Sequence, residues 1–193
     1  MTGTLERRAA MTALMQGRGD DLLVVPGLGS TTYDLAAAGD NDRNFYLWGA
    51  MGGAAMIGLG LALAQPDKRV AVITGDGEML MGMGALATIG IQQPETLAVI
   101  VFDNGMYLET GGQPSHTAGG VDIVSVARSC GFGTCLEVTD EAGLADLAGR
   151  LKTLKSLLVA RVAIKPEEPP RVLPEKEGAV LKRRFRAALG LTP

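Results

Sequence analysis

Two short apolar runs, residues 69–74 and 97–102, are each followed at once by residues that can bind anions or metal ions. The first run ends at Gly75-Asp76-Gly77 and the second at Asp103-Asn104. Apolar runs of this length are typical of strands buried on both faces of a parallel sheet. The segment between them, with a helical pattern over 79–91, is long enough for the crossover that parallel strands need. Both strand ends are therefore expected at the same edge of one sheet.

The rest of the chain alternates between helical and strand patterns. Helices are predicted over 5–16, 31–38 (with Ser30 as N-cap), 53–64, 122–129 and 141–151, and strands over 22–25, 45–48, 136–138 and 157–163. Such alternation is typical of a mostly parallel sheet covered by helices on both faces. We therefore predict a three-layer α/β/α domain over residues 1–164.

Residues 165–193 differ in composition from this domain. Pro and Glu dominate the start of the segment, which predicts a linker, and a basic amphipathic helix is predicted over 179–189. Its basic side chains are Lys182, Arg183, Arg184 and Arg186. This helix either presents a solvated basic face or docks on a partner subunit.

Charge and composition exclude some functions. The net charge of −3 and the aromatic content of 4% offer neither a basic surface nor stacking platforms for nucleic acid. Cys130 and Cys135 have no metal-ligand spacing and are expected to be free thiols in a reducing compartment. The apolar stretch 45–64 reaches the length of a membrane span, but several glycines interrupt it. We predict a cytoplasmic protein that binds neither nucleic acid nor a membrane.

The strand ends suit a diphosphate group with a bridging Mg²⁺. Gly75-Asp76-Gly77-Glu78 can present backbone N–H groups to phosphate oxygens at close range, because glycine has no side chain. Mg²⁺ prefers an octahedron of oxygen ligands. We predict that the Asp76 carboxylate, the Asn104 amide oxygen and the backbone carbonyl of Met106 supply three of them.

The motif from Gly75 to Asn104 resembles the fingerprint of the diphosphate-binding domain of thiamine-diphosphate-dependent enzymes, GDG followed about two dozen residues later by Asn. The resemblance adds Glu78 and Tyr107 to the cofactor-binding residues. Upstream, Gly49-Ala50-Met51-Gly52 is similar to the turn beneath the cofactor in the decarboxylases of this family. It implies that the Gly49 carbonyl accepts a hydrogen bond from the aminopyrimidine, and that Met51 is an apolar wedge between the two rings. Alternatively, Met51 is simply a core residue.

The segment after Asn104 contains Glu-Thr-Gly-Gly-Gln and looks most like the small, beta-type subunit of sulfopyruvate and phosphonopyruvate decarboxylases. A long polar loop over a cofactor site is a candidate lid or substrate contact. The side chains that could donate hydrogen bonds to an anionic substrate are Thr110, Gln113, Ser115, His116 and Thr117. His116 is the single histidine of the chain, and either substrate contact or simple exposure fits it.

Thiamine chemistry also needs a carboxylate beside the pyrimidine ring, which in this family lies on a separate pyrimidine-binding domain. No second α/β domain fits around residues 44–131. Glu6, Glu78 and Glu95 are poor candidates, because they are predicted on a surface helix, in the diphosphate loop and in a turn. The resemblance therefore implies an alpha-type partner subunit that supplies this glutamate, and a hetero-oligomer such as α2β2 or larger with the cofactor at the interface.

The implied activity is decarboxylation of a small anionic 2-oxo acid, such as 3-sulfopyruvate or phosphonopyruvate. The thiazolium ring of the cofactor would accept the electron pair that CO₂ leaves behind. The alternatives are a subunit of an acetolactate-synthase-like carboligase or of an E1-type dehydrogenase, and a non-catalytic cofactor-binding module. Donors to the distal anion of the substrate are expected on the partner subunit; Arg43, which precedes the cofactor turn, is either a further contributor or a surface residue.

Overall fold

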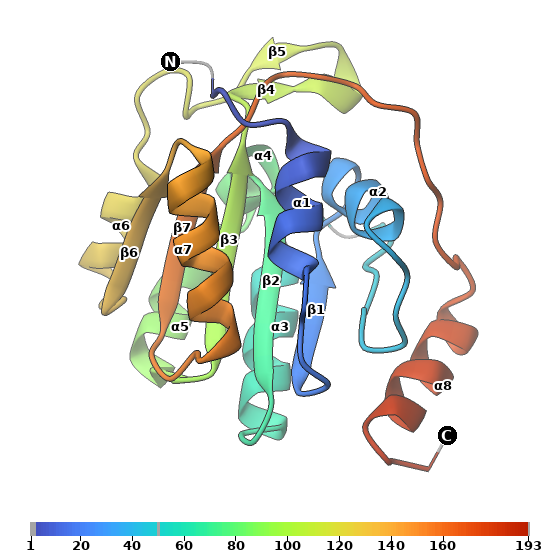
Figure 1. Ribbon diagram of the computed structural model, residues 1–193. Coiled ribbons are helices and arrows are strands. Elements are labelled where there is room, and N and C mark those ends of the chain that lie inside the picture. The colour runs from blue at the N-terminus through green and yellow to red at the C-terminus, as the bar shows by residue number, and fades with distance from the viewer. Residues whose placement is uncertain (1–2, 50, 193) are drawn as a thin grey trace.

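The computed structural model describes residues 3–49 and 51–192, in which a five-stranded parallel sheet lies between two layers of helices (Figure 1). The sheet order is β1 (Leu22–Pro26), β2 (Arg69–Gly75), β3 (Leu97–Asp103), β7 (Leu158–Ala163) and β6 (Thr134–Val138). One face is covered by α1 (Arg7–Met15), α2 (Ser30–Ala37) and α7 (Glu141–Lys152). The other is covered by α3 (Ala54–Ala64), α4 (Asp76–Met81), α5 (Ala85–Gln92) and α6 (Ile123–Ser129). The predicted fold class is confirmed.

The central strands are buried on both faces, as their apolar sequences predict. Every residue of β1 and β3 is buried, and β2 is half-buried only at its two ends. In the parallel register of β2 and β3, Gly75 pairs with Phe102. Asp76 and Asp103 therefore follow at the same edge of the sheet. No helix in the described part of the chain has the length and apolar character needed to cross a membrane.

Two predicted elements differ from the structure. The predicted helix over 79–91 is two helices, α4 and α5, with a break at Gly82, where a Cβ would lie 2.2 Å from the carbonyl oxygen of Gly52. The predicted strand over 45–48 was wrong as well, because none of these residues belongs to a strand; the one bridge beside them joins Asn44, just before the segment, to Val24. At α2, the helix begins at Ser30, so its N-cap is Gly29 rather than Ser30.

The loop after β3, the candidate lid or substrate contact, contains a small hairpin. Its strands β4 (Met106–Tyr107) and β5 (Gln113–Pro114) pair antiparallel, and a single 3-10 turn (Leu108–Thr110) connects them. The hairpin lies above the carboxyl ends of the strands, at the top of Figure 1.

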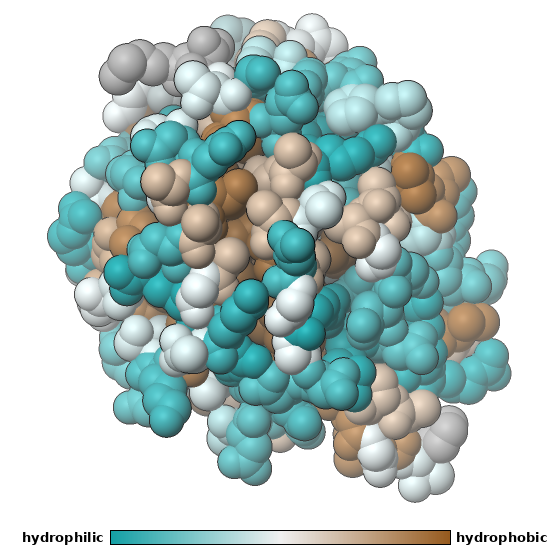
Figure 2. All heavy atoms as spheres, in the orientation of Figure 1, coloured by the Kyte–Doolittle hydropathy of each residue, from teal (hydrophilic) through white to brown (hydrophobic). Residues whose placement is uncertain are grey.

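The C-terminal helix α8 (Gly178–Ala188) packs on its own domain. Leu181 and Phe185 are buried, and the ring of Phe185 meets that of Phe45 edge to face at 5.3 Å. Lys182 and Arg183 are exposed, which is compatible with both sequence interpretations, a solvated basic face and docking on a partner subunit. The surface formed by α1, α2 and α7 is mostly hydrophilic, with apolar side chains showing between α1 and α7 (Figure 2).

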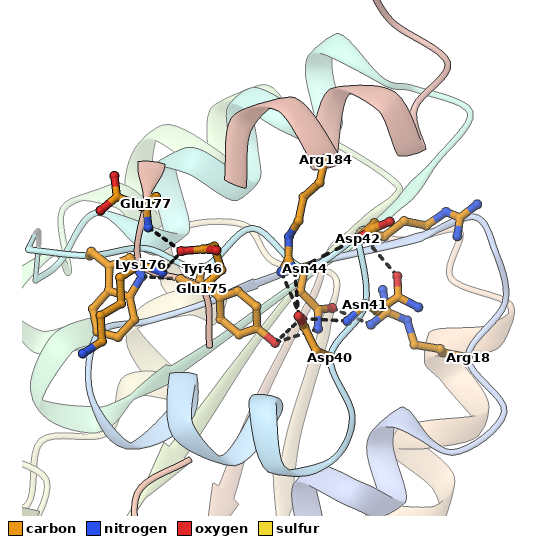
Figure 3. A network of polar contacts seen from close by, with 12 residues as sticks. Arg18, Asp40, Asn41, Asp42, Asn44, Tyr46, Glu175, Lys176, Glu177 and Arg184 are labelled. Carbon is orange, nitrogen blue, oxygen red and sulfur yellow. Dashed lines mark hydrogen bonds and ion pairs between the residues drawn. The ribbon is translucent and has the colours of Figure 1, made fainter. Parts of the chain in front are cut away.

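A polar network fixes α8 against residues 40–48 (Figure 3). The Arg184 guanidinium donates two hydrogen bonds to the Asp40 carboxylate, at 2.6 and 2.9 Å, and lies over the ring of Tyr46. The Tyr46 hydroxyl donates to the same carboxylate at 2.9 Å. The indole N–H of Trp48 donates to the carbonyl oxygen of Glu175 at 3.1 Å. The C-terminal segment is thus attached to the stretch that leads into Gly49 and Met51.

Candidate functional site

A cavity of about 600 Å³ opens at the carboxyl edge of the sheet, where β1, β2 and β3 end. It collects most of the residues that the sequence singled out: Met51, Gly75, Asp76, Gly77, Glu78, Asn104, Met106, Tyr107 and Thr110. Gly49, Gln113 and His116 are exposed and do not line it. Ala50 lies outside the described residues. The parallel register of the sheet is what brings the two motifs together.

The Asp76 carboxylate is the central charged group of this cavity. Asp76 is only 3% exposed, and its Oδ2 accepts hydrogen bonds from Ser115 Oγ at 2.5 Å and Thr117 Oγ1 at 3.2 Å. Burial, reinforced by the nearby Asp103 carboxylate, raises the pKa of Asp76 to about 6 against the hydroxyl donors. Ser115 and Thr117, expected to face a substrate, instead donate to this carboxylate. No Lys or Arg of the described residues forms an ion pair with Asp76.

Asp103 holds the turn that carries Asn104. Its Oδ1 accepts from the backbone N–H of Gly105 at 2.9 Å and from Thr117 Oγ1 at 2.8 Å, and its Oδ2 forms an ion pair with Arg161. These contacts satisfy Asp103 within the chain, so its function is structural.

The turn from Asn104 to Met106 brings two neutral oxygen donors to the same corner. Asn104 Oδ1 accepts the backbone N–H of Met106 at 2.8 Å, and Gly105 between them has a φ of +72°, which favours glycine. An amide oxygen has two lone pairs, so this bond leaves one for a further partner. The Asp76 carboxylate, the Asn104 amide and a backbone carbonyl form a hard oxygen donor set of the kind that Mg²⁺ accepts. No group of three His, Cys, Asp or Glu side chains with metal-site geometry occurs in residues 3–49 and 51–192, so an ion here would rest on one carboxylate and neutral oxygens.

Gly77 leaves the floor of the cavity free of side chain. A Cβ at Gly77 would lie 2.4 Å from Cε1 of the Tyr107 ring, so the first turn of α4 and the hairpin can approach this closely only with glycine. Tyr107 thereby forms one side of the cavity, and Gly77 contributes only backbone atoms to the cavity lining.

The Glu78 side chain turns away from the solvent and packs against Gly27. A Cβ at Gly27 would lie 1.7 Å from Glu78 Oε2. The carboxyl group is buried, which raises its pKa, although the nearby Thr74 hydroxyl and the backbone N–H groups of Leu28, Gly52 and Ala54 counteract part of that shift. Glu78 is thus buried at the cavity wall, and its two carboxylate oxygens make no hydrogen bond to a described residue.

Met51 is not a core residue. Its side chain is 45% exposed and lines the cavity, close to where Gly52 packs against Gly82. Met81, 63% exposed, also lines the cavity. An exposed methionine at the mouth of this cavity is compatible with the wedge that the resemblance implies, and its exposure excludes the alternative that Met51 only fills the core.

The N-terminus of α2 belongs to the site and was missed by the sequence analysis. Gly29, Ser30 and Thr31 line the cavity. Gly29 has a φ of +82°, and the first backbone N–H groups of a helix have no partners within the helix, so they suit an anion. Arg7 donates to Ser30 Oγ at 2.7 Å and pairs with the buried Asp34 at 2.9 Å. The signal was the run Gly27-Leu28-Gly29-Ser30, which joins a buried strand to a helix at the same edge.

Comparison with known proteins places the chain in a family. The family model described as "Thiamine pyrophosphate enzyme, C-terminal TPP binding domain" matches residues 28–160. The sulfopyruvate decarboxylase subunit beta of Methanocaldococcus jannaschii is 34% identical, over 91% of this chain and 93% of that protein. The phosphonopyruvate decarboxylase of Streptomyces viridochromogenes is 39% identical over 97% of this chain, which spans only 47% of that longer protein.

The fold has a solved counterpart as well. The crystal structure of benzoylformate decarboxylase from Polynucleobacter necessarius superimposes with a TM-score of 0.70 at 20% identity, over 86% of this chain and 34% of that one. The family match includes the edge of the sheet that carries Asp76 and Asn104. The chain therefore belongs to the thiamine pyrophosphate enzymes, through their C-terminal TPP-binding domain, in the group of sulfopyruvate decarboxylase beta subunits and phosphonopyruvate decarboxylases.

Proposed function

We propose that this chain is the diphosphate- and Mg²⁺-binding subunit of a thiamine-diphosphate-dependent decarboxylase that acts on 3-sulfopyruvate or phosphonopyruvate. The observation that carries the proposal is the buried Asp76 carboxylate, which faces a cavity beside Asn104 without a cationic partner among the described residues. The names of these two relatives supply the substrate class.

The cofactor would be held at both ends. Asp76, Asn104 and the carbonyl of Met106 would bind Mg²⁺, and the backbone N–H groups of residues 75–78 and of the start of α2 would bind the diphosphate. Met51 would separate the two rings, and the Gly49 carbonyl would orient the aminopyrimidine. Once bound, thiamine diphosphate supplies a nucleophilic carbon and an electron sink for decarboxylation.

The remaining part of the active site would come from a pyrimidine-binding alpha-type subunit. Four large apolar side chains are exposed on the helices beside the cavity: Met56 and Leu63 on α3, Met81 on α4 and Ile91 on α5. The three helices cover the same face of the sheet, and exposed apolar side chains on such a layer are candidates for a protein interface. We propose that the partner covers this face, supplies the catalytic glutamate, and forms a hetero-oligomer such as α2β2 or larger.

Two further proposals concern the chain as a whole. Residues 1–164 would be the cofactor-binding domain and residues 165–193 an accessory segment. Cys130 and Cys135 are free thiols, which supports a location in the reducing cytoplasm.

The test is reconstitution with an alpha-type subunit. We expect CO₂ release from 3-sulfopyruvate or phosphonopyruvate by the pair, none by either subunit alone, and loss of activity when EDTA removes Mg²⁺. If the pair turns over no 2-oxo acid, the decarboxylase proposal is wrong. A carboligation product instead of an aldehyde would favour an acetolactate-synthase-like reaction.

A further inference from the structure

Residues 165–177, here called the strap, cross the top of the molecule from the end of β7 past α1 and α2 to α8 (Figure 1). The strap contains no helix or strand, yet it is attached at both ends. The backbone N–H of Arg7 donates to Glu167 Oε1 at 3.0 Å, and Arg8 donates to the carbonyl oxygen of Pro170 at 2.8 Å. At the far end, Trp48 donates to the carbonyl oxygen of Glu175. The part of the strap between Pro170 and Glu175 is therefore fixed to the surface of the domain at both of its ends.

Arg171 lies in this held part of the strap, at the rim of the cavity. Its Nη2 donates to Glu109 Oε2 at 2.8 Å, and its guanidinium lies over the Tyr33 ring, 5.4 Å from the centroid. Glu109 and Tyr33 both line the cavity. The Glu109 side chain in turn lies against Gly29, the N-cap of α2. Arg171 thus reaches the mouth of the cavity from a segment far from it in sequence.

The cavity wall lacks a cation that is free to bind a substrate. Among its described lining residues, Arg7 is the one Lys or Arg, and it is buried and paired with Asp34. The other charged lining residues are acidic: Asp34, Asp76, Glu78 and Glu109. A substrate with two anionic groups would meet a negative wall unless a cation at the rim offsets it.

We propose that Arg171 binds the distal sulfonate or phosphonate of the 2-oxo acid, and so selects substrates that carry a distal anion. This inference rests on the proposed function. A guanidinium carries five N–H donors in a planar fork that matches tetrahedral oxyanions, and the structure engages Nη2 alone in a hydrogen bond to a described residue. Its side chain is 62% exposed, so the Glu109 carboxylate can be exchanged for an incoming anion without opening the core.

The proposal is testable because Arg171 contributes little to the fold. Exposed ion pairs add little stability, so Arg171→Gln should fold and assemble normally. Arg171→Lys keeps the charge but loses the planar fork. Arg183 is the matched control, since it is an exposed arginine on α8 with no hydrogen bond or ion pair to the described residues.

Steady-state kinetics would be measured on the reconstituted complex, saturated with Mg²⁺ and thiamine diphosphate. We expect Arg171→Gln to raise KM for the distally charged 2-oxo acid at least about tenfold, with Arg171→Lys intermediate and Arg183→Gln unchanged. The Kd of thiamine diphosphate should be the same in all four proteins. An unchanged KM in Arg171→Gln would overturn the proposal, and so would a raised cofactor Kd with an unchanged KM, because the cation would then serve the cofactor.

A binding experiment separates this proposal from the proposed function. The inert analogue 3-sulfopropanoate is titrated into the complex by calorimetry, with butanoate as the analogue that lacks the distal anion. Tighter binding of 3-sulfopropanoate that Arg171→Gln abolishes would support the anion site, even if no 2-oxo acid were decarboxylated. Equal affinities of the wild type and Arg171→Gln would overturn it, even in an active decarboxylase.

Discussion

Two buried carboxylates lie at the ends of neighbouring strands, Asp76 after β2 and Asp103 after β3. They differ in whether a cationic side chain neutralises their charge. They are 3% and 2% exposed and share the hydroxyl of Thr117, at 3.2 and 2.8 Å. Asp103 pairs with Arg161, whereas Asp76 meets only hydroxyl groups among the described residues. Burying an unpaired charge is unfavourable, so such a carboxylate persists where a ligand supplies the missing cation. The comparison therefore assigns Asp103 a structural role and leaves Asp76 as the carboxylate that is available to a ligand.

Replacing Asp76 should have the largest effect, and that effect should fall on binding. We expect Asp76→Asn to weaken Mg²⁺-dependent binding of thiamine diphosphate by more than about 100-fold, because the only charged ligand of the proposed site is lost. Calorimetric titration with and without Mg²⁺ would measure it. Unchanged affinity would contradict the ligand assignment. Stability should not fall, since the substitution removes a buried charge whose pKa is raised to about 6.

Replacing Asp103 should reverse this pattern. Asp103→Asn leaves Arg161 with Glu137 as its remaining partner, at 3.0 Å, and weakens the anchor of the Gly105 turn. We expect a loss of about 2–3 kcal/mol in the free energy of unfolding, since Arg161 is only 26% exposed. Urea unfolding of Asp76→Asn and Asp103→Asn side by side would measure it. Equal stabilities in the two variants would refute the division of roles.

The Thr117 hydroxyl lies between the two carboxylates. Removing it should therefore moderately lower both the stability of the fold and the affinity for the cofactor. We expect Thr117→Val to cost about 1–2 kcal/mol of stability, because it removes the single O–H donor that lies between two buried carboxylates. Cofactor affinity should fall by a few-fold. The control is Thr110→Val, whose hydroxyl is exposed and makes only 3.4 Å contacts. A change in stability or affinity in the control as large as that in Thr117→Val would show that the hydroxyl bridge is unimportant.

The corner itself could be predicted from sequence, because its parts follow directly from a sheet pattern. The apolar runs before Gly75 and Asp103 predict adjacent parallel strands, and their register places Asp76 near Asn104. The fold class follows from the same alternation. Local sequence was sufficient to predict the position of a residue wherever that residue directly follows a strand of the sheet.

Other features depend on contacts between distant segments. The break between α4 and α5 is set by the contact of Gly82 with Gly52, which no helical pattern reveals. Ser115 and Thr117 were expected to face a substrate, and only the fold of the hairpin shows that they face Asp76. The contact of Arg171 with Glu109 joins residues 62 positions apart. Predicting these features requires the three-dimensional structure, because the local sequence around each of these residues is equally compatible with an ordinary surface position.

A third carboxylate, Asp40, extends the comparison to the surface, where the smallest effect is expected. Burial opposes ionisation of Asp40, but hydrogen bonds from Arg184 and Tyr46 outweigh it and hold its pKa below the usual 3.8. A lowered pKa stabilises the folded state above pH 3.8, and that contribution is lost as the pH falls through the lower folded value. Because the Asp40 side chain is 45% exposed, solvent screening limits the contribution to about 1 kcal/mol or less. Acid should therefore loosen α8 only below about pH 4.

Trp48 reports on this step, because it is the single tryptophan and its indole N–H bonds to Glu175 in the strap. We expect its fluorescence to change below about pH 4 in the wild type. In Arg184→Gln the change should already be present at neutral pH, since the Arg184–Asp40 ion pair is then absent at every pH. Lys182→Gln is the control, because Lys182 is an exposed cation on the same helix, and it should titrate like the wild type. An acid transition of equal size in Arg184→Gln would mean that carboxylates other than Asp40 control it. The ion pair of Asp40 with Arg184 would then contribute nothing measurable to the acid transition. In that case, pairing with a guanidinium would not by itself explain why Asp103 and Asp76 differ.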